Sequence, residues 1–160
     1  MDSKYKEKKN FTEIEILKFL KMTIGTLIFL QDNGFKNNQL DKDSILFCGD
    51  KVKILDMAIA SNCPYQEILD GKRHQDGCYL APELLKDLKE KNYEPFLSPK
   101  SDVFSLGMLT VEMACLEPLD SYYDFENFSI DYESLIHRVS RIVYSVELKT
   151  LLAGMLEYEG

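Results

Sequence analysis

The four cysteines of this 160-residue sequence form no Cys-x-x-Cys pair, and no apolar segment of the kind that directs secretion opens the chain. The first absence argues against a common cysteine-based metal or redox motif, and the second argues against an extracellular protein. Together they favour reduced thiols in a cytoplasmic-type compartment. The cysteines are Cys48, Cys63, Cys78 and Cys115.

A metal site could still be drawn from Cys63, His74 and Cys78, which would supply three zinc ligands. Their spacing matches no common zinc site. We therefore interpret them as loop and core residues and expect no metal and no other cofactor.

Positive charge is also scarce, since the formal net charge is -8. A strongly acidic chain is poorly suited to non-specific binding of nucleic acid or of an anionic membrane. The only basic cluster, Lys4 to Lys9, is interrupted by Glu7, and we interpret it as a solvated tail. The apolar run from Ile16 to Leu30 contains two lysines and Gly25 and is too short to span a bilayer, which predicts a core helix rather than membrane insertion.

The composition, with 45% hydrophobic and 29% charged residues, is typical of a soluble globular domain. A chain of this length can bury a substantial core. We expect residues 1–10 to form an N-terminal tail and residues 11–160 to form one domain.

The pattern along the chain predicts mainly helices and one β-hairpin. Thr12 is a good N-cap, and Glu15 stands three residues later, where a capping box requires it. The helix should end near Gln31, before Asn33-Gly34, a natural left-handed exit. Gly49-Asp50 between two apolar runs predicts the hairpin turn. The other expected elements are strands 44–48 and 51–55, a long loop 61–77, and helices 81–91, 101–118, 132–142 and 145–156.

Four segments in this order resemble the C-terminal lobe of a protein kinase. "NNQLDKDSIL" at 37–46 falls on the catalytic loop, whose family motif is H-R-D-L-x-x-x-N, and "KILDMAIA" at 53–60 falls on the D-F-G segment. "YLAPE" at 79–83 is similar to the end of the activation segment, and "SDVFSLGMLTVEM" at 101–113 is similar to the central helix of that lobe. The resemblance implies a mainly α, α+β fold: a C-lobe-like helical domain with one β-hairpin and no N-lobe, truncated at its C-terminal end.

The catalytic positions implied by this resemblance carry the wrong chemistry for phosphoryl transfer. The catalytic Asp is Gln39, whose neutral amide is not a usable base, and the metal-binding Asn is Ser44, a weaker ligand. The preceding His and Arg of the family are Asn37 and Asn38. The domain therefore resembles a pseudokinase.

The metal-binding Asp of the family is retained as Asp56, but Met57 and Ala58 follow it in place of Phe and Gly. Asp56 alone cannot hold a metal-bound nucleotide. We favour its interpretation as a vestigial residue that caps backbone amides at the end of a strand, and we expect no ATP binding.

The scaffold residues of the family are kept. Asp102 resembles the Asp that hydrogen-bonds amides of the catalytic loop, and Ala81, Pro82 and Glu83 form the A-P-E motif. The Arg that pairs with this Glu in the family would lie beyond residue 160, so Glu83 needs another partner or lies in solvent. Apolar residues expected to hold the loop and hairpin on the buried helices are Leu40, Ile45, Leu46, Ile54, Phe104, Leu106 and Met113.

Two surfaces are candidates for binding a protein partner. A C-lobe without its N-lobe should expose apolar surface on its hairpin and loop. The segment 119–133 is acidic and aromatic and contains no Lys or Arg, and it either binds a partner or folds its aromatic side chains onto the domain. Its possible anchor residues are Tyr122, Tyr123, Phe125, Phe128 and Tyr132.

The resemblance thus implies a catalytically inactive, kinase-like, protein-binding or structural subunit of a larger assembly, for example a cytoskeletal one. Two alternatives stay open. The domain could bind a nucleotide as a regulator, or it could be a residual protein kinase that another chain completes.

Overall fold

The computed structural model is mainly helical, with two short antiparallel strand pairs, and this confirms the expected fold class. It describes residues 10–34, 40, 45–48, 51–54, 79–90 and 99–157. Within these ranges no helix combines the length and the apolar content that a membrane span requires.

The first helix, α2 (Glu13–Asp32), begins and ends as its sequence predicts. The amide of Thr12 donates to the Glu15 carboxylate at 2.7 Å, and the Glu15 amide donates to Thr12 Oγ1 at 3.3 Å, which completes the capping box. At the other end the Asn33 side chain donates to the Phe29 carbonyl at 2.7 Å, and Gly34 takes a φ of +78° that suits glycine.

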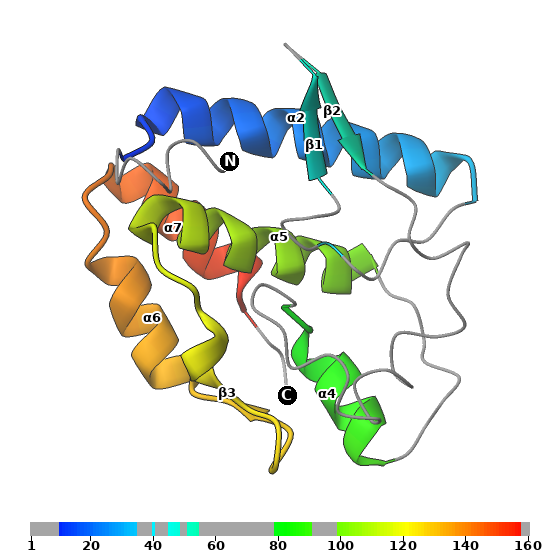
Figure 1. The fold of residues 1–160 in the computed structure, drawn as a ribbon, viewed down its shortest axis with the longest axis vertical. Helices are drawn as coiled ribbons and strands as arrows, with labels where there is room; N and C mark the ends of the chain where they lie inside the picture. Colours follow the sequence, from blue (N-terminus) through cyan, green and yellow to red (C-terminus); the bar gives the residue numbers. More distant parts are fainter. Residues whose placement is uncertain are drawn as a thin grey trace.

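The predicted hairpin consists of β1 (Ile45–Cys48) and β2 (Lys51–Ile54), which pair from Ile45 opposite Ile54 to Cys48 opposite Lys51. It packs across α2 (Figure 1). Because side chains alternate along a strand, Ile45 is buried whereas Leu46 is 44% exposed. The expectation that Leu46 holds the hairpin on the core was therefore wrong. The other expected core residues are buried or packed against the core: Leu40, Ile45, Ile54, Phe104, Leu106 and Met113.

The C-terminal half of the chain supplies the remaining elements. Their bounds are α4 (Pro82–Lys89), α5 (Pro99–Cys115), the 3-10 turn η1 (Asp120–Tyr122), β3 (Tyr123–Asp124), β4 (Ser129–Ile130), α6 (Tyr132–Ser140) and α7 (Val146–Met155).

Two sequence predictions need correction in this half. Helix α5 begins at Pro99 rather than at a Ser101-Asp102 cap, because the fixed φ of proline suits the first helical turn. The segment 119–133 contains a second hairpin, β3–β4, so the described part of the chain has two strand pairs where one was expected. Each strand is only two residues long, which is too short to leave an alternating pattern in the sequence.

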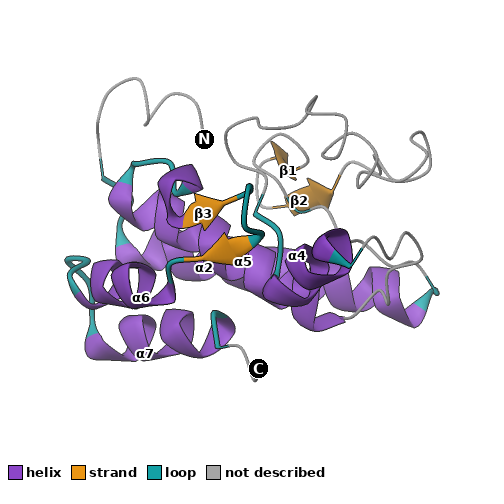
Figure 2. Ribbon diagram, turned by 90° about the horizontal axis from the view of Figure 1, so that it is seen from below, coloured by secondary structure: helices purple, strands orange, loops and turns teal. Residues whose placement is uncertain are grey.

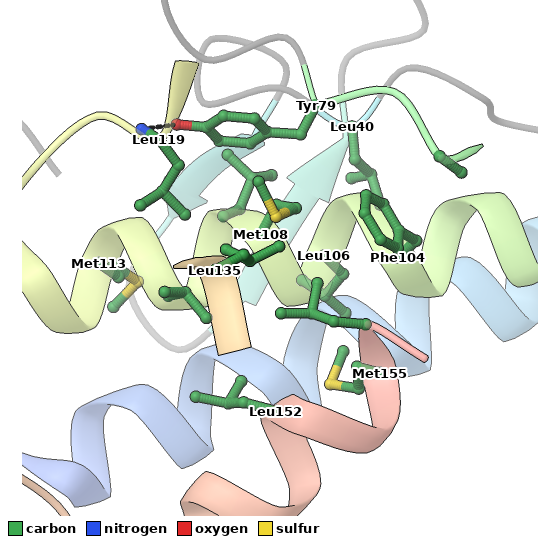
Figure 3. Close-up of a cluster of buried hydrophobic side chains, with 14 of the residues drawn as sticks. Leu40, Tyr79, Phe104, Leu106, Met108, Met113, Leu119, Leu135, Leu152 and Met155 are labelled. Atoms are coloured by element: carbon green, nitrogen blue, oxygen red, sulfur yellow. Dashed lines mark hydrogen bonds between the residues drawn. The ribbon is translucent and has the colours of Figure 1, made fainter. Parts of the chain in front are cut away.

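Helix α5 is the centre of the domain. It contacts α2, α4 and α7, and α6 lies beside α7 at the edge away from β1–β2 (Figures 1 and 2). A Cβ added at Gly107 of α5 would lie 3.1 Å from the side chains of Met155 and Leu156, so glycine permits this close approach to the end of α7. Figure 3 shows Leu106 on the side of α5 that faces Leu152 and Met155.

Hydrogen bonds also join α2 to the start of α7. The Glu13 carboxylate accepts from the amide of Ser145 at 2.9 Å and from its hydroxyl at 2.6 Å. The Tyr144 hydroxyl donates to the Phe11 carbonyl at 2.7 Å. Ser145 also caps α7, as predicted, by accepting from the Leu148 amide. The start of α2 is thus fastened to the start of α7.

Candidate functional site

The residues assigned to the catalytic loop and the D-F-G segment lie outside the described residues; these are Asn37, Asn38, Gln39, Ser44 and Asp56. The same holds for Cys63, His74 and Cys78. Within the described ranges no group of three His, Cys, Asp or Glu side chains could hold a metal ion. The structure does describe residues that adjoin these segments, and the first of them, Leu40, is fully buried.

Asp102 lies in the first turn of α5, where its side chain is half-buried. Its Oδ1 atom has no hydrogen-bond partner among the described residues. Burial without a compensating partner raises the pKa of Asp102 to about 7. The bonds to catalytic-loop amides that the resemblance implies would fall on residues outside the described ranges, so that role stays a prediction.

The A-P-E motif forms the start of α4. Ala81 is fully buried and occupies the N-cap position, and Pro82 occupies the first helical turn. The Glu83 carboxylate accepts a hydrogen bond of 2.7 Å from the hydroxyl of Ser101, a buried residue of α5. Ser101 is therefore the partner that the sequence left open for Glu83, and it joins the start of α4 to the start of α5.

Tyr79 is the centre of a buried polar network. Its hydroxyl donates to the Glu112 carboxylate at 2.6 Å and accepts from the Leu119 amide at 2.9 Å, as Figure 3 shows for Leu119. Its carbonyl accepts from the Ser105 hydroxyl at 2.6 Å. Burial raises the pKa of Tyr79, and the adjacent Glu112 carboxylate raises it further. Tyr79 thus anchors the segment before α4 onto α5.

Comparison with known families supports the assignment that this frame suggests. A family model described as the protein kinase domain matches residues 1–159. The chain belongs to the protein kinase domain family.

One curated relative is cyclin-dependent kinase F-3 of Oryza sativa subsp. japonica, which is 28% identical over 113 residues. The match covers 68% of this chain and 24% of that protein. The chain thus spans about a quarter of the length of this relative.

In this kinase-like domain the acidic-aromatic segment folds onto its own core. The five possible anchor residues, Tyr122, Tyr123, Phe125, Phe128 and Tyr132, are all half-buried and pack against the core cluster. The Tyr123 ring stacks between Tyr79 and Phe125, with ring centroids 6.2 and 5.3 Å away, and its hydroxyl donates to the Leu80 carbonyl at 2.8 Å. Packing thus accounts for much of this aromatic surface, and partner binding by these residues stays a prediction.

Sequence reasoning missed Ser101, Ser105 and Glu112 as partners of the kinase-like motifs. A signal was present for two of them, because Ser105 and Glu112 are polar positions within the mainly apolar stretch from Val103 to Met113. All three residues are buried, and buried polar groups are nearly always hydrogen-bonded. The partners themselves are far away in the sequence, and periodicity could not name them.

Proposed function

We propose that this chain is a kinase-like domain without phosphoryl-transfer activity that acts as a protein-binding or structural subunit of a larger assembly. The observation that carries the proposal is Gln39 at the position of the catalytic Asp. An amide cannot accept the proton of a substrate hydroxyl, and a kinase depends on accurately placed charges rather than on covalent chemistry.

Two further substitutions support the proposal. Ser44 replaces the second metal-binding residue, and Asn38 replaces the Arg that would receive a phosphorylated activation loop. Residues 63–96 contain no Ser or Thr that could carry such a phosphate. Both the transfer chemistry and its usual switch are therefore degenerate in the same chain.

The polar contacts of the scaffold, by contrast, are in place. Tyr79 contacts Glu112 and Leu119, Ser105 contacts the Tyr79 backbone, and Ser101 contacts Glu83. Buried hydrogen-bond networks of this kind fix one arrangement of a core. Their presence beside degenerate catalytic positions supports a domain that acts through its shape and its surface.

A phosphoryl-transfer assay tests the inactive part of the proposal. The purified chain is incubated with radiolabelled ATP and either Mg²⁺ or Mn²⁺, with and without general protein substrates. We expect no incorporation above that of an Asp56→Ala variant. Incorporation by the unsubstituted chain that is lost in Asp56→Ala would overturn the proposal.

The retained Asp56 favours a second candidate, a regulator that binds a nucleotide without turning it over. A ligand that binds only the folded state raises the melting temperature. A rise of several degrees with Mg-ATP, lost in Asp56→Ala, would favour this candidate. No shift would favour a domain that contacts only proteins.

A further inference from the structure

The exposed apolar side chains of α2 have the spacing of a coiled-coil seam. Ile14, Leu17, Ile24 and Ile28 are 70, 44, 39 and 51% exposed. With Lys21 between them, their positions follow one another at intervals of three, four, three and four residues, which is the a and d pattern of a heptad. We name these five residues the α2 stripe.

The stripe is presented by a helix that the domain already holds in place. On its other face α2 buries Ile16, Phe19, Leu20 and Thr23. Glu13 is fixed by hydrogen bonds to Ser145 at the start of α7. From Ile14 to Ile28 the stripe is about 21 Å long at the usual rise of an α-helix. A partner that covered it would therefore not have to order the helix first.

We propose that the α2 stripe is the interface of an antiparallel homodimer, in which a second copy of this chain packs the same stripe against the first. Isologous two-fold pairing is the commonest way in which soluble proteins form dimers. This proposal concerns assembly and does not depend on whether the domain transfers phosphate.

Lys21 decides the direction of pairing. In a parallel, in-register pair the two Lys21 side chains would occupy the same layer, where like charges repel each other. In an antiparallel pair Lys21 lies opposite the partner's Ile24, and Leu17 lies opposite the partner's Ile28. The ammonium group of Lys21 can then reach solvent while its aliphatic stem covers apolar surface.

Charge and space at the helix centre also suit the antiparallel pair. It places the exposed Lys18 and Lys21 opposite Leu27 and Ile24 of the second copy, so no two lysines meet at the centre of the pair. A Cβ placed at the exposed Gly25 would have no atom within 4 Å, so this position leaves room for a close helix crossing.

The available area fits a weak dimer. The four apolar members of the stripe offer on the order of 400 Å² per copy, so a symmetric pair buries at most about 800 Å². Specific interfaces usually bury about 1,200–2,000 Å² in total, so this pair lies below that range, as weak and transient contacts do. We therefore expect dissociation in the micromolar range.

Sedimentation velocity of the purified chain over a hundred-fold concentration range tests the proposal. We expect the mass to rise from 18.5 kDa towards twice that value as the concentration increases. Ile24→Asp should remove the rise, whereas Lys21→Leu should strengthen association at least tenfold. Val143→Asp is the matched control, because Val143 is 92% exposed and lies outside the stripe. Circular dichroism of each variant verifies that it is folded.

Cysteine cross-linking tests the direction of pairing. A Leu17→Cys chain is mixed with an Ile28→Cys chain and oxidised, and the linked peptides are identified by mass spectrometry. The antiparallel arrangement predicts a link between positions 17 and 28 in the mixture and none between two Leu17→Cys chains. A monomer at every concentration, a dimer that persists in Ile24→Asp, or a link between two positions 17 would overturn the proposal. A monomer would leave the stripe to a different protein.

Discussion

Helices α2 and α5 are both apolar on nearly every side in sequence, but they are buried to different extents. Every residue of α5 from Phe104 to Met113 is buried, including Ser105, Thr110 and Glu112. Helix α2 buries one face and exposes several large apolar side chains on the other. The difference arises because α5 is packed between α2, α4 and α7 (Figure 1), whereas among the described elements α2 packs mainly against α5 and β2.

An apolar helix is buried on all sides only when enough neighbouring elements pack against it. The expected exposed patch was assigned to the hairpin and loop, where Leu46 is the one large apolar side chain found exposed among the described residues. Among the described residues before α4, the other exposed large apolar side chains all lie on α2. The same helix that anchors the core thus also presents an exposed apolar face.

Truncation of one leucine in each helix should give the largest contrast. Leu106 of α5 is fully buried, so Leu106→Ala should reduce the free energy of unfolding by about 3–4 kcal/mol through lost contacts and a cavity. Leu17→Ala on α2 should cost less than about 1 kcal/mol in the monomer, because Leu17 is 44% exposed. Urea denaturation of both variants at low protein concentration measures this. Equal losses of unfolding free energy in the two variants would contradict the difference in burial between the helices.

Removal of the Tyr79 hydroxyl should have the next largest effect. Tyr79→Phe leaves the buried amide of Leu119 without this acceptor and takes one donor away from Glu112. Loss of one partner in a buried polar network costs about 2–3 kcal/mol. Glu112→Gln keeps an acceptor near the hydroxyl and should cost less. A Tyr79→Phe variant as stable as the wild type in thermal denaturation would show that the network does not hold α5 to the segment before α4.

The carboxyl group of Asp102 should make stability depend on pH. Its pKa is raised from 3.8 to about 7, so the folded protein keeps a proton that the unfolded chain releases. The free energy of unfolding should therefore fall as the pH rises from about 4 to about 7. Between about pH 5 and pH 7, the free energy of unfolding of Asp102→Asn should rise relative to that of the wild type by on the order of 1 kcal/mol. An NMR titration that gave a pKa below 4 for Asp102 would contradict this and would indicate hydrogen bonds from the loop before Leu40.

Replacement of Thr23 should have the smallest effect, and it should stabilise the fold. Thr23 is fully buried on the inner face of α2, and its hydroxyl has no hydrogen-bond partner within the described ranges. Thr23→Val keeps the shape and removes an unsatisfied polar group, so it should raise the free energy of unfolding by up to about 1 kcal/mol. Thr26→Val is the matched control, because the Thr26 hydroxyl donates to the Met22 carbonyl. A loss in Thr23→Val would mean that its hydroxyl has a partner.

Local signals predicted most of this fold. The capping box at Thr12, the exit at Gly34, Pro82 at the start of α4 and the Ser145 cap each depend on residues within one helical turn. Features that depend on distant contacts were not predicted. The pairing of Ser101 with Glu83 and of Tyr79 with Glu112 joins residues 18 and 33 positions apart, and no periodicity encodes such pairs.

The candidate site, too, was predicted only in part. Its residue types could be compared with the kinase motifs directly, and this comparison predicts that Gln39 and Ser44 occupy degenerate catalytic positions. The anchor role proposed for Tyr123 and Phe125 could not be decided from composition, because an aromatic side chain serves equally well in a core and at an interface. Their half-buried, stacked arrangement became visible only with the fold.

The most direct test of the central claim is the native size of the protein in a gentle lysate of its own source, measured by gel filtration and blotting. A kinase-like domain that serves as a subunit should elute in a complex clearly larger than two copies of an 18.5 kDa chain. Elution at the mass of one copy, with phosphoryl-transfer activity in the same fraction, would contradict the account.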